Sequence, residues 1–160
     1  MATLAELNLP TRLFLQAYPW RRIDPVPWAP LRRPLAESRF ALVTSAGFVL
    51  PGQERFSAEL RGGDVSFREI PADADLSSLV ETHRSQSFDH TGIRSDPNLA
   101  LPLDRCRELV AAGRIGELNH RHLSFMGSIT APGRLVRDTA PEAARRLAGD
   151  GVEAALLVPV

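Results

Sequence analysis

Cysteine and long apolar runs are scarce in this sequence. Among its 160 residues Cys106 is the only cysteine, which excludes an internal disulfide framework and a cysteine-based zinc site. No apolar run approaches the roughly 18 residues that a membrane-spanning helix needs. The amino terminus also lacks a basic segment followed by an apolar one, so the sequence predicts no signal peptide. We therefore expect a cytoplasmic protein that does not sit in a membrane.

The sequence contains no lysine and carries no formal net charge. All 19 basic residues are arginines, they are balanced by 19 acidic residues, and the formal net charge is zero. No field of one sign therefore draws the protein to nucleic acid or to an anionic membrane, and we expect neither as a partner. A hydrophobic fraction of 44% and a charged fraction of 24% are typical of an ordinary globular domain.

The sequence predicts two regions, a proline-rich N-terminal arm over residues 1–36 and an α/β domain over residues 37–160. Five prolines at 19, 25, 27, 30 and 34 exclude a long helix after Tyr18. Before them, residues 4–18 can hold a short amphipathic helix. Partner binding is an alternative role for this arm.

Two segments read as strands of one sheet. RFALVTSAGFVL at 39–50 starts as an apolar run and breaks into Thr44, Ser45 and Gly47, which predicts a buried strand followed by a loop. VEAALLVPV at 152–160 is a second buried-strand pattern. We predict an open, mostly parallel, Rossmann-like α/β sheet with flanking helices, because buried parallel strands read as continuous apolar runs. Neither of the common phosphate-loop patterns occurs.

Two helices are expected in the second half of the chain. Leu103, Cys106, Leu109 and Val110 are spaced for a helix over about 103–112, which places Cys106 on the apolar face as a buried structural thiol. Residues 139–149 form the clearest helix, with Thr139 and Glu142 spaced as a capping box.

The polar stretch HRSQSFDHTGIRSDPNLALPLD at 83–104 is the main candidate site. It is too polar to form a core, and its isolated His, Phe and Ile residues are unlike disorder, so we predict an ordered functional loop. His83 and His90 could exchange protons near neutral pH, and Arg94 could hold a substrate carboxylate. Asp89 and Asp96 complete the set of candidate substrate-binding residues.

A structural role for the same stretch stays open. Asp89, Asp96 and Asn98 could cap turns while Arg94 pairs with an aspartate. A metal held by a histidine, an aspartate and a second histidine is conceivable, but spacing in a loop fixes no geometry, so we predict no metal site. His120 and His122 would share one face of a strand, either as half of a metal site or, as we expect, as two exposed histidines.

Several blocks of sequence resemble one known family. FREIP at 67–71, the block from His83 to Arg105, GRIGEL at 113–118, HLSFMGSI at 122–129 and the segment from Thr139 to Val160 are similar to the selenoprotein B family. That family covers subunits of the glycine, sarcosine and betaine reductases and the proline-binding subunit of D-proline reductase. The resemblance runs from about Phe40 to Val160.

The resemblance implies an oxidoreductase subunit that reductively cleaves a C–N bond of a small amine or amino acid. It implies a partner reductase subunit that carries the pyruvoyl group, a dithiol donor protein such as thioredoxin, and an oligomeric assembly. No cofactor is expected in this chain. The reactive selenocysteine or cysteine of the family would follow a strand similar to LLVPV, and hence would follow Val160.

Three alternatives for the function follow. In the first, the chain is the N-terminal part of a longer selenoprotein that is interrupted at a recoded codon. Its sheet is then incomplete on the C-terminal side, and we expect the isolated chain to be inactive. Alternatively, the segment 152–160 is the final strand, at the edge of a complete small sheet. A non-catalytic binding or assembly module with the same fold is the second function. A separate hydrolase or metal enzyme built on the histidines of 83–104 is the third, and no nucleophile–base pair supports it.

Overall fold

The computed structural model describes residues 4–19, 22–85 and 90–160. The chain divides into two compact units, Met1–Pro30 and Leu31–Val160. In the first unit a 3-10 turn, η1 (Leu4–Glu6), precedes helix α1 (Leu9–Ala17). The Asn8 side chain caps this helix by accepting a hydrogen bond of 3.0 Å from the Thr11 N–H. The predicted short N-terminal helix is therefore confirmed.

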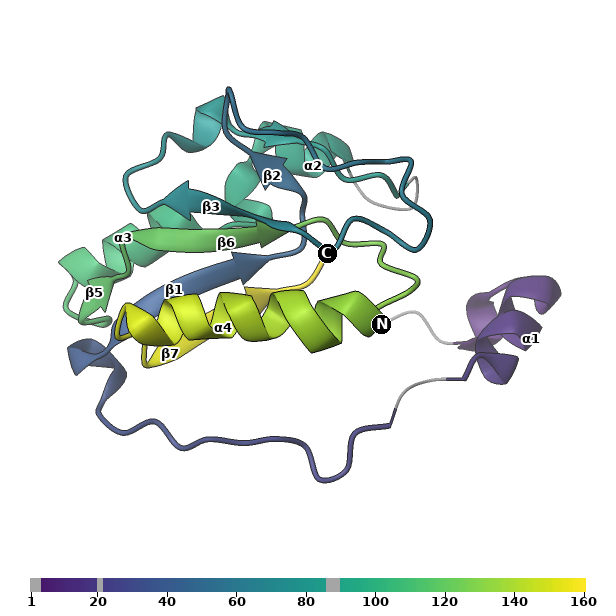
Figure 1. The fold of residues 1–160 in the computed structure, drawn as a ribbon, viewed down its shortest axis with the longest axis horizontal. Helices are drawn as coiled ribbons and strands as arrows, with labels where there is room; N and C mark the ends of the chain where they lie inside the picture. The colour runs from purple at the N-terminus through teal and green to yellow at the C-terminus, as the bar shows by residue number, and fades with distance from the viewer. Residues whose placement is uncertain (1–3, 20–21, 86–89) are drawn as a thin grey trace. The chain divides into compact units, whose positions relative to one another are not determined.

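The second unit is built on a five-stranded sheet with β1 (Arg39–Thr44) at its centre (Figure 1). The short strand β5 (Glu117–Leu118) and strand β6 (Arg121–Phe125) run parallel to β1, and β7 (Ala154–Val158) pairs with it in parallel over five residue pairs. Strand β3 (Phe67–Pro71) lies antiparallel on the outer side of β6. The predicted open, mostly parallel α/β sheet is confirmed.

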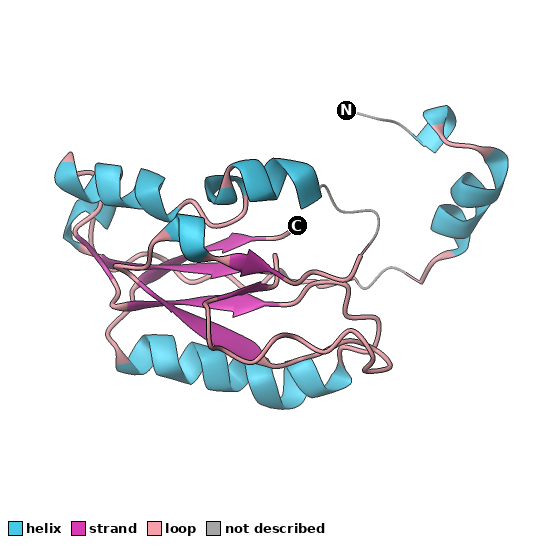
Figure 2. Cartoon of the chain, turned by 90° about the horizontal axis from the view of Figure 1, so that it is seen from above, coloured by secondary structure: helices cyan, strands magenta, loops and turns pink. Residues whose placement is uncertain are grey.

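Helices cover both faces of the sheet, as the view from above shows (Figure 2). One face packs on the segment that contains η3 (Leu76–Ser78), α2 (His90–Ser95), η4 (Pro97–Leu99) and α3 (Leu103–Ala111). The other face packs on α4 (Ala140–Gly149). Adjacent residues of β1 serve opposite faces, with Leu42 in the α3 core and Ala41 in the α4 core. This alternation is the ordinary consequence of the two-residue period of a strand.

A small second sheet lies beyond the end of β1. Strand β2 (Phe48–Val49) pairs antiparallel with β4 (Val80–Glu81), which brings Glu81 opposite Phe48. A 3-10 turn, η2 (Leu35–Glu37), leads into β1. The β2–β4 pair places the start of the polar stretch 83–104 beside the carboxyl end of β1.

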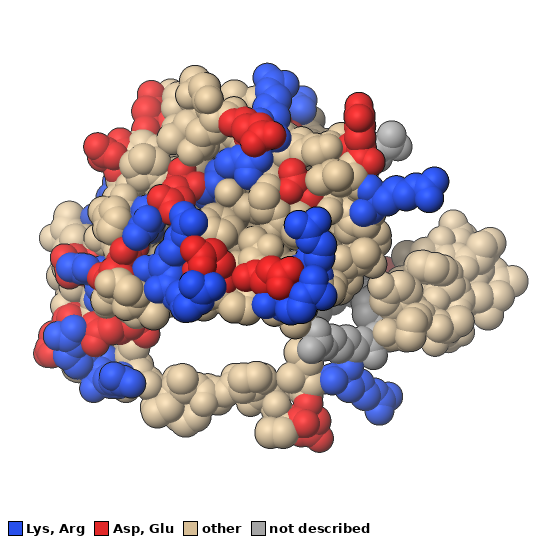
Figure 3. Space-filling model, in the orientation of Figure 1, with Lys and Arg blue, Asp and Glu red and all other residues tan. Residues whose placement is uncertain are grey.

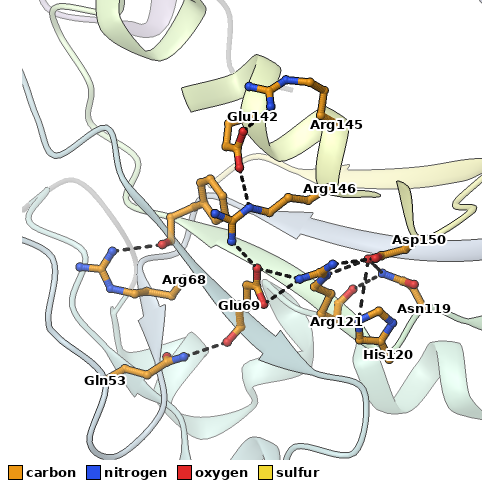
Figure 4. A network of polar contacts seen from close by, with 11 residues as sticks. Gln53, Arg68, Glu69, Asn119, His120, Arg121, Glu142, Arg145, Arg146 and Asp150 are labelled. Carbon is orange, nitrogen blue, oxygen red and sulfur yellow. Dashed lines mark hydrogen bonds and ion pairs between the residues drawn. The ribbon is translucent and has the colours of Figure 1, made fainter. Parts of the chain in front are cut away.

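Charged side chains join three elements on the face of the sheet that packs on α4 (Figure 4). Arg121 of β6 bonds Asp150, which follows α4, at 2.6 Å and Glu69 of β3 at 3.1 Å. Arg146 of α4 bonds the same Glu69 at 2.7 Å. The Asp150 side chain is only 9% exposed, and its hydrogen bonds from Arg121 and Asn119 hold the pKa of its carboxyl far below the usual range. This network fixes the α4–β7 turn against β6 and β3.

The predicted helices are present, but the predicted capping box is wrong. Residues 103–111 and 140–149 are helical. Thr139 makes no capping hydrogen bond because it already has helical dihedral angles and ends a π-helical turn, η5 (Leu135–Thr139). Glu142 instead bonds Arg145 at 2.7 Å and Arg146 at 2.8 Å. The stretch 83–104 is likewise not a continuous loop, since it contains α2 and η4.

The second predicted strand exists, but the prediction that it is buried is wrong. The side chain of Leu157 is 67% exposed and that of Leu156 is 42% exposed. Within the described ranges β7 pairs with β1 alone, so it lies at an edge of the sheet. An apolar run therefore identified the strand without identifying its place in the sheet.

Cys106 lies in the α3 core, as predicted. Its thiol is buried, and burial raises the pKa of that thiol. Over the residues that the structure describes, no helix combines the length and the apolar character that crossing a bilayer requires.

Candidate functional site

The carboxyl ends of three parallel strands meet at one edge of the sheet. The Gly127 N–H, just after β6, donates to the Ser45 carbonyl at 2.8 Å, just after β1. At the end of β7, the Val160 N–H donates to Ser45 Oγ at 3.0 Å. Ligands of open α/β sheets bind at this edge, because the loops after parallel strands converge there. The small residues that follow β1 and β6 thus line the natural position for a site.

Two glycines in these loops leave room for His83. Gly47 has φ 69°, and a Cβ added to it would lie 3.0 Å from the His83 backbone nitrogen. A Cβ added to Gly127 would lie 2.5 Å from His83 Nε2. Neither position tolerates a side chain without movement of His83. The histidine therefore packs directly against the loops that follow β1 and β6.

His83 is held in its neutral form. The residue is 7% exposed, and the Ser85 N–H donates a hydrogen bond of 3.2 Å to its Nδ1. An imidazole nitrogen that accepts a hydrogen bond carries no proton, so the proton of the neutral ring is on Nε2. Burial lowers the pKa of His83. Burial and this hydrogen bond therefore both favour the neutral form of His83.

Glu81 organises this cluster, and sequence reasoning did not single it out. Its side chain is only 2% exposed. The carboxylate lies 2.8 Å from His90 Nδ1 and 3.2 Å from an Arg94 guanidinium nitrogen, and it also accepts a hydrogen bond from the His83 backbone N–H. One buried carboxylate thus bonds three of the residues from the stretch 83–104. Its place two residues before His83 is the only sequence signal that could have indicated it.

His90 differs from His83 in the direction of its pKa shift. Its Nδ1 bonds Glu81, and its Nε2 lies 2.9 Å from the Ser85 carbonyl oxygen. Both partners are hydrogen-bond acceptors, so they favour the protonated ring, in which both nitrogens donate. The hydrogen bond to Glu81 is the largest cause of a raised pKa of His90, and the hydrogen bond to the Ser85 carbonyl is the second largest. With ring centroids 6.5 Å apart, the two histidines have pKa values shifted in opposite directions, an arrangement suited to an acid–base pair.

The structure gathers some of the predicted site residues and separates others. His83, His90 and Arg94 lie around Glu81, and the Arg94 side chain is 67% exposed. Glu81 and Arg94 also line a cavity of about 440 Å³ between β4, α2 and η4. Asp96 is not among the residues that bond Glu81. Its carboxylate accepts a hydrogen bond of 3.0 Å from the Asn98 N–H and caps η4. Asp89 falls outside the described residues.

The predicted pair of exposed histidines is wrong for His122. His122 is fully buried within β6, and its Nδ1 accepts a hydrogen bond of 3.1 Å from the Leu42 N–H. His120 is exposed and lies 3.9 Å from Asp150. Within residues 4–19, 22–85 and 90–160, the structure contains no group of three or more His, Cys, Asp or Glu side chains that could hold a metal ion.

Fold and site together define an α/β protein with two histidines around a buried glutamate at the carboxyl edge of a mostly parallel sheet. The comparison with protein families then assigns it. Residues 6–160 match the family described as glycine/sarcosine/betaine reductase selenoprotein B, and the chain belongs to that family.

Curated relatives carry related names. The chain is 35% identical over 144 residues to D-proline reductase subunit gamma of Acetoanaerobium sticklandii, which covers 89% of this chain and 57% of the relative. It is 30% identical over 149 residues to sarcosine reductase complex component B subunit beta of Peptoclostridium acidaminophilum, covering 90% of this chain and 33% of the relative. Glycine reductase complex component B subunit gamma of Carboxydothermus hydrogenoformans is 28% identical over 144 residues, covering 90% and 33%.

The chain thus spans a little over half of the first relative and about a third of the other two. No solved structure matches it significantly. The shared names are those of subunits in reductase complexes, and the family assignment rests on sequence.

Proposed function

We propose that this chain provides the α/β domain of a subunit in a reductase of the glycine, sarcosine, betaine or D-proline type. The reaction would break the C–N bond of a small amine or amino acid, and each fragment would gain a hydrogen. A dithiol would supply the two electrons and two protons and would leave as a disulfide. The observation that carries the proposal is the family match over residues 6–160.

The reactive group of this reaction would be a selenocysteine or cysteine positioned after Val160. Cys106 is poorly suited to the role, because it is buried in the α3 core and burial raises the pKa of its thiol, whereas an exchanging thiol reacts as the anion. The hydrogen bonds between Val160 and Ser45 support the position of the expected residue, since they hold the end of β7 at the carboxyl edge of the sheet.

Within this proposal the cluster around Glu81 would serve the substrate. His83 packs on Gly127, whose N–H bonds the Ser45 carbonyl, so the end of β7 and the acid–base pair belong to one continuous set of contacts. His90 would supply a proton to the leaving nitrogen and Glu81 would keep it protonated. The exposed Arg94 guanidinium would face a substrate carboxylate, because a planar fork pairs well with two carboxylate oxygens. Asp89 and Asp96 would complete the binding residues.

The partners follow from the same proposal. A second reductase subunit would carry the pyruvoyl group, and a dithiol protein such as thioredoxin would reduce the disulfide. We propose that the assembly is an oligomer in the cytoplasm and that this chain binds no cofactor of its own. The names of the relatives, which are all subunits of reductases, support the existence of partner subunits.

The nucleotide sequence after the Val160 codon tests the proposal first. We expect it to encode a selenocysteine or cysteine, followed by an apolar, helix-periodic segment. The second test is reductase activity of the complete reading frame, expressed with selenocysteine insertion and its partner subunit, with a dithiol as reductant. An open frame without selenocysteine or cysteine near its start, or a closed frame, contradicts the catalytic proposal and favours a binding or assembly module with this fold.

A further inference from the structure

A second hollow, distinct from the cluster around Glu81, lies at the same edge of the sheet. It is a groove of about 710 Å³ between the turn at 60–67 and the segment at 131–139. The first wall leads into β3, and the second follows β6. Because β3 is antiparallel to β6, both walls rise from the edge that carries the candidate site.

Backbone contacts hold the two walls in fixed positions. The Gly62 carbonyl accepts hydrogen bonds from the Thr130 N–H at 2.9 Å and from the Ala131 N–H at 3.0 Å. Gly63 has φ 103°, and a Cβ added there would lie 2.9 Å from Ile129 Cα. Such close approach and positive φ require glycine. The groove is therefore built into the fold.

An arginine from outside the groove adds a further link. Arg84, the neighbour of His83, donates one hydrogen bond of 3.0 Å to the Leu60 carbonyl and another of 3.0 Å to the Ser128 carbonyl. Ser128 has φ 56°, which a non-glycine residue seldom adopts. The link from Arg84 ties the groove to the segment that carries the candidate site.

Most charges that line the groove already have partners. Arg137 bonds Asp138 at 3.0 Å, and Arg146 bonds Glu69 at 2.7 Å. The buried carboxylate of Asp64 accepts hydrogen bonds from the Ser57 N–H and from both polar hydrogens of Ser66. The interleaving of acidic and basic side chains is visible over the face that carries α4 (Figure 3).

Arg61 and Arg134 are different. Each lines the groove and is exposed, and within residues 4–19, 22–85 and 90–160 neither guanidinium has an ion pair or hydrogen bond. They belong to opposite walls, one on the turn at 60–67 and the other on the segment at 131–139. Two free guanidinium groups across a preformed groove form a site for an anion.

The apolar side chains that line the groove indicate which kind of anion it can bind. Leu60, Val65 and Phe67 line the same groove. An inorganic ion would leave this surface unused, whereas a molecule with a hydrocarbon part would cover it. We propose that the groove binds an organic carboxylate, with its carboxylate group between Arg61 and Arg134 and its hydrocarbon part against Leu60, Val65 and Phe67. This site does not depend on the proposed reductase function.

Titration of the full 160-residue chain with hydrocinnamate tests this inference, with binding followed by calorimetry and by amide NMR shifts. We expect saturable binding with the largest shifts at Gly62 and Gly63. Hydrocinnamyl alcohol, which lacks the carboxylate, and inorganic phosphate, which lacks the hydrocarbon part, should each bind at least about tenfold more weakly.

Variants locate the site. Arg61→Ala and Arg134→Ala should each weaken hydrocinnamate binding about tenfold, and Arg134→Lys should weaken it less because the charge remains. Arg114→Ala removes another exposed arginine, outside the groove, and should leave binding unchanged. Circular dichroism verifies that each variant is folded. The inference is overturned if hydrocinnamate does not saturate, if phosphate binds as tightly, or if Arg61→Ala binds like Arg114→Ala.

Discussion

The carboxylate of Glu81, almost completely buried, lies 2.8 Å from Nδ1 of His90. A buried carboxylate needs a positive or hydrogen-bonding partner, and His90 provides both when it is protonated. The pair therefore favours the protonated form of His90. It also joins the small β2–β4 sheet to α2.

Replacement of Glu81 by glutamine should lower the pKa of His90 toward the ordinary value of about 6.5. In the wild-type protein the raised pKa means that protonated His90 stabilises the fold below about pH 6.5, and this contribution is lost as pH rises through the folded pKa. NMR titration of the His90 ring measures the change. Glu108→Gln, on the exposed surface of α3, is the matched control. An unchanged His90 titration in Glu81→Gln would contradict the assigned role of Glu81.

His122 should make the protein sensitive to acid. Burial lowers the pKa of His122 to about 4, so the unfolded chain takes up a proton more readily than the folded chain. Its contribution to stability is complete above about pH 6.5 and falls as pH decreases, by roughly 3 kcal/mol at pH 4. Urea unfolding between pH 7 and pH 4 measures this loss.

The variant His122→Asn separates this effect from that of other groups. Asparagine can still accept the Leu42 N–H, but it does not titrate. We expect a less stable protein at pH 7 whose stability changes less between pH 6.5 and pH 4. An acid dependence equal to that of the wild type would show that other groups cause it.

Removal of the charge at Asp150 should destabilise the fold. Asp150→Asn weakens the bonds from Arg121 and Asn119 at a nearly buried position, and we expect a loss of about 2 kcal/mol. The exposed pair Arg105–Glu108, with both side chains 60% exposed, provides the control. Arg105→Ala should cost less than about 0.5 kcal/mol. Equal losses in the two variants, measured by urea unfolding, would be inconsistent with a structural role of the network.

Cys106 should be unreactive in the folded protein. Its burial in the α3 core keeps the thiol protonated and out of contact with reagents. A disulfide reagent such as DTNB should modify the native chain very slowly and the urea-unfolded chain rapidly. Rapid modification of the native chain would mean that Cys106 can take part in thiol exchange, and the reactive residue of the proposed function would then need reassignment.

The second unit should fold without the first. Residues 31–160 have their own cores on both faces of the sheet, and the division of the chain falls at Pro30. A variant that starts at Leu31 should therefore melt within a few degrees of the full chain. A large decrease in melting temperature, or loss of cooperative unfolding, would show that the arm contributes to the stability of the domain.

Local patterns account for much of the fold. The apolar run at 39–44 identified the central strand, and the spacing of Leu103, Cys106 and Val110 identified α3 and its buried face. Both depend on a periodicity that the chain itself carries. The capping box at Thr139 failed because a π-helical turn extends through that residue, and no local rule indicates such a turn.

The sequence by itself determined that the chain is an α/β protein of the selenoprotein B family and that its polar residues concentrate at 83–104. Only the tertiary structure decided which of those residues meet. Glu81 reaches His90 and Arg94 because β4 pairs with β2, and His83 reaches Gly127 because two strand ends converge. The edge position of β7 and the burial of His122 also came from strand pairing. Pairing joins residues far apart in the chain, and periodicity in one segment does not contain that information.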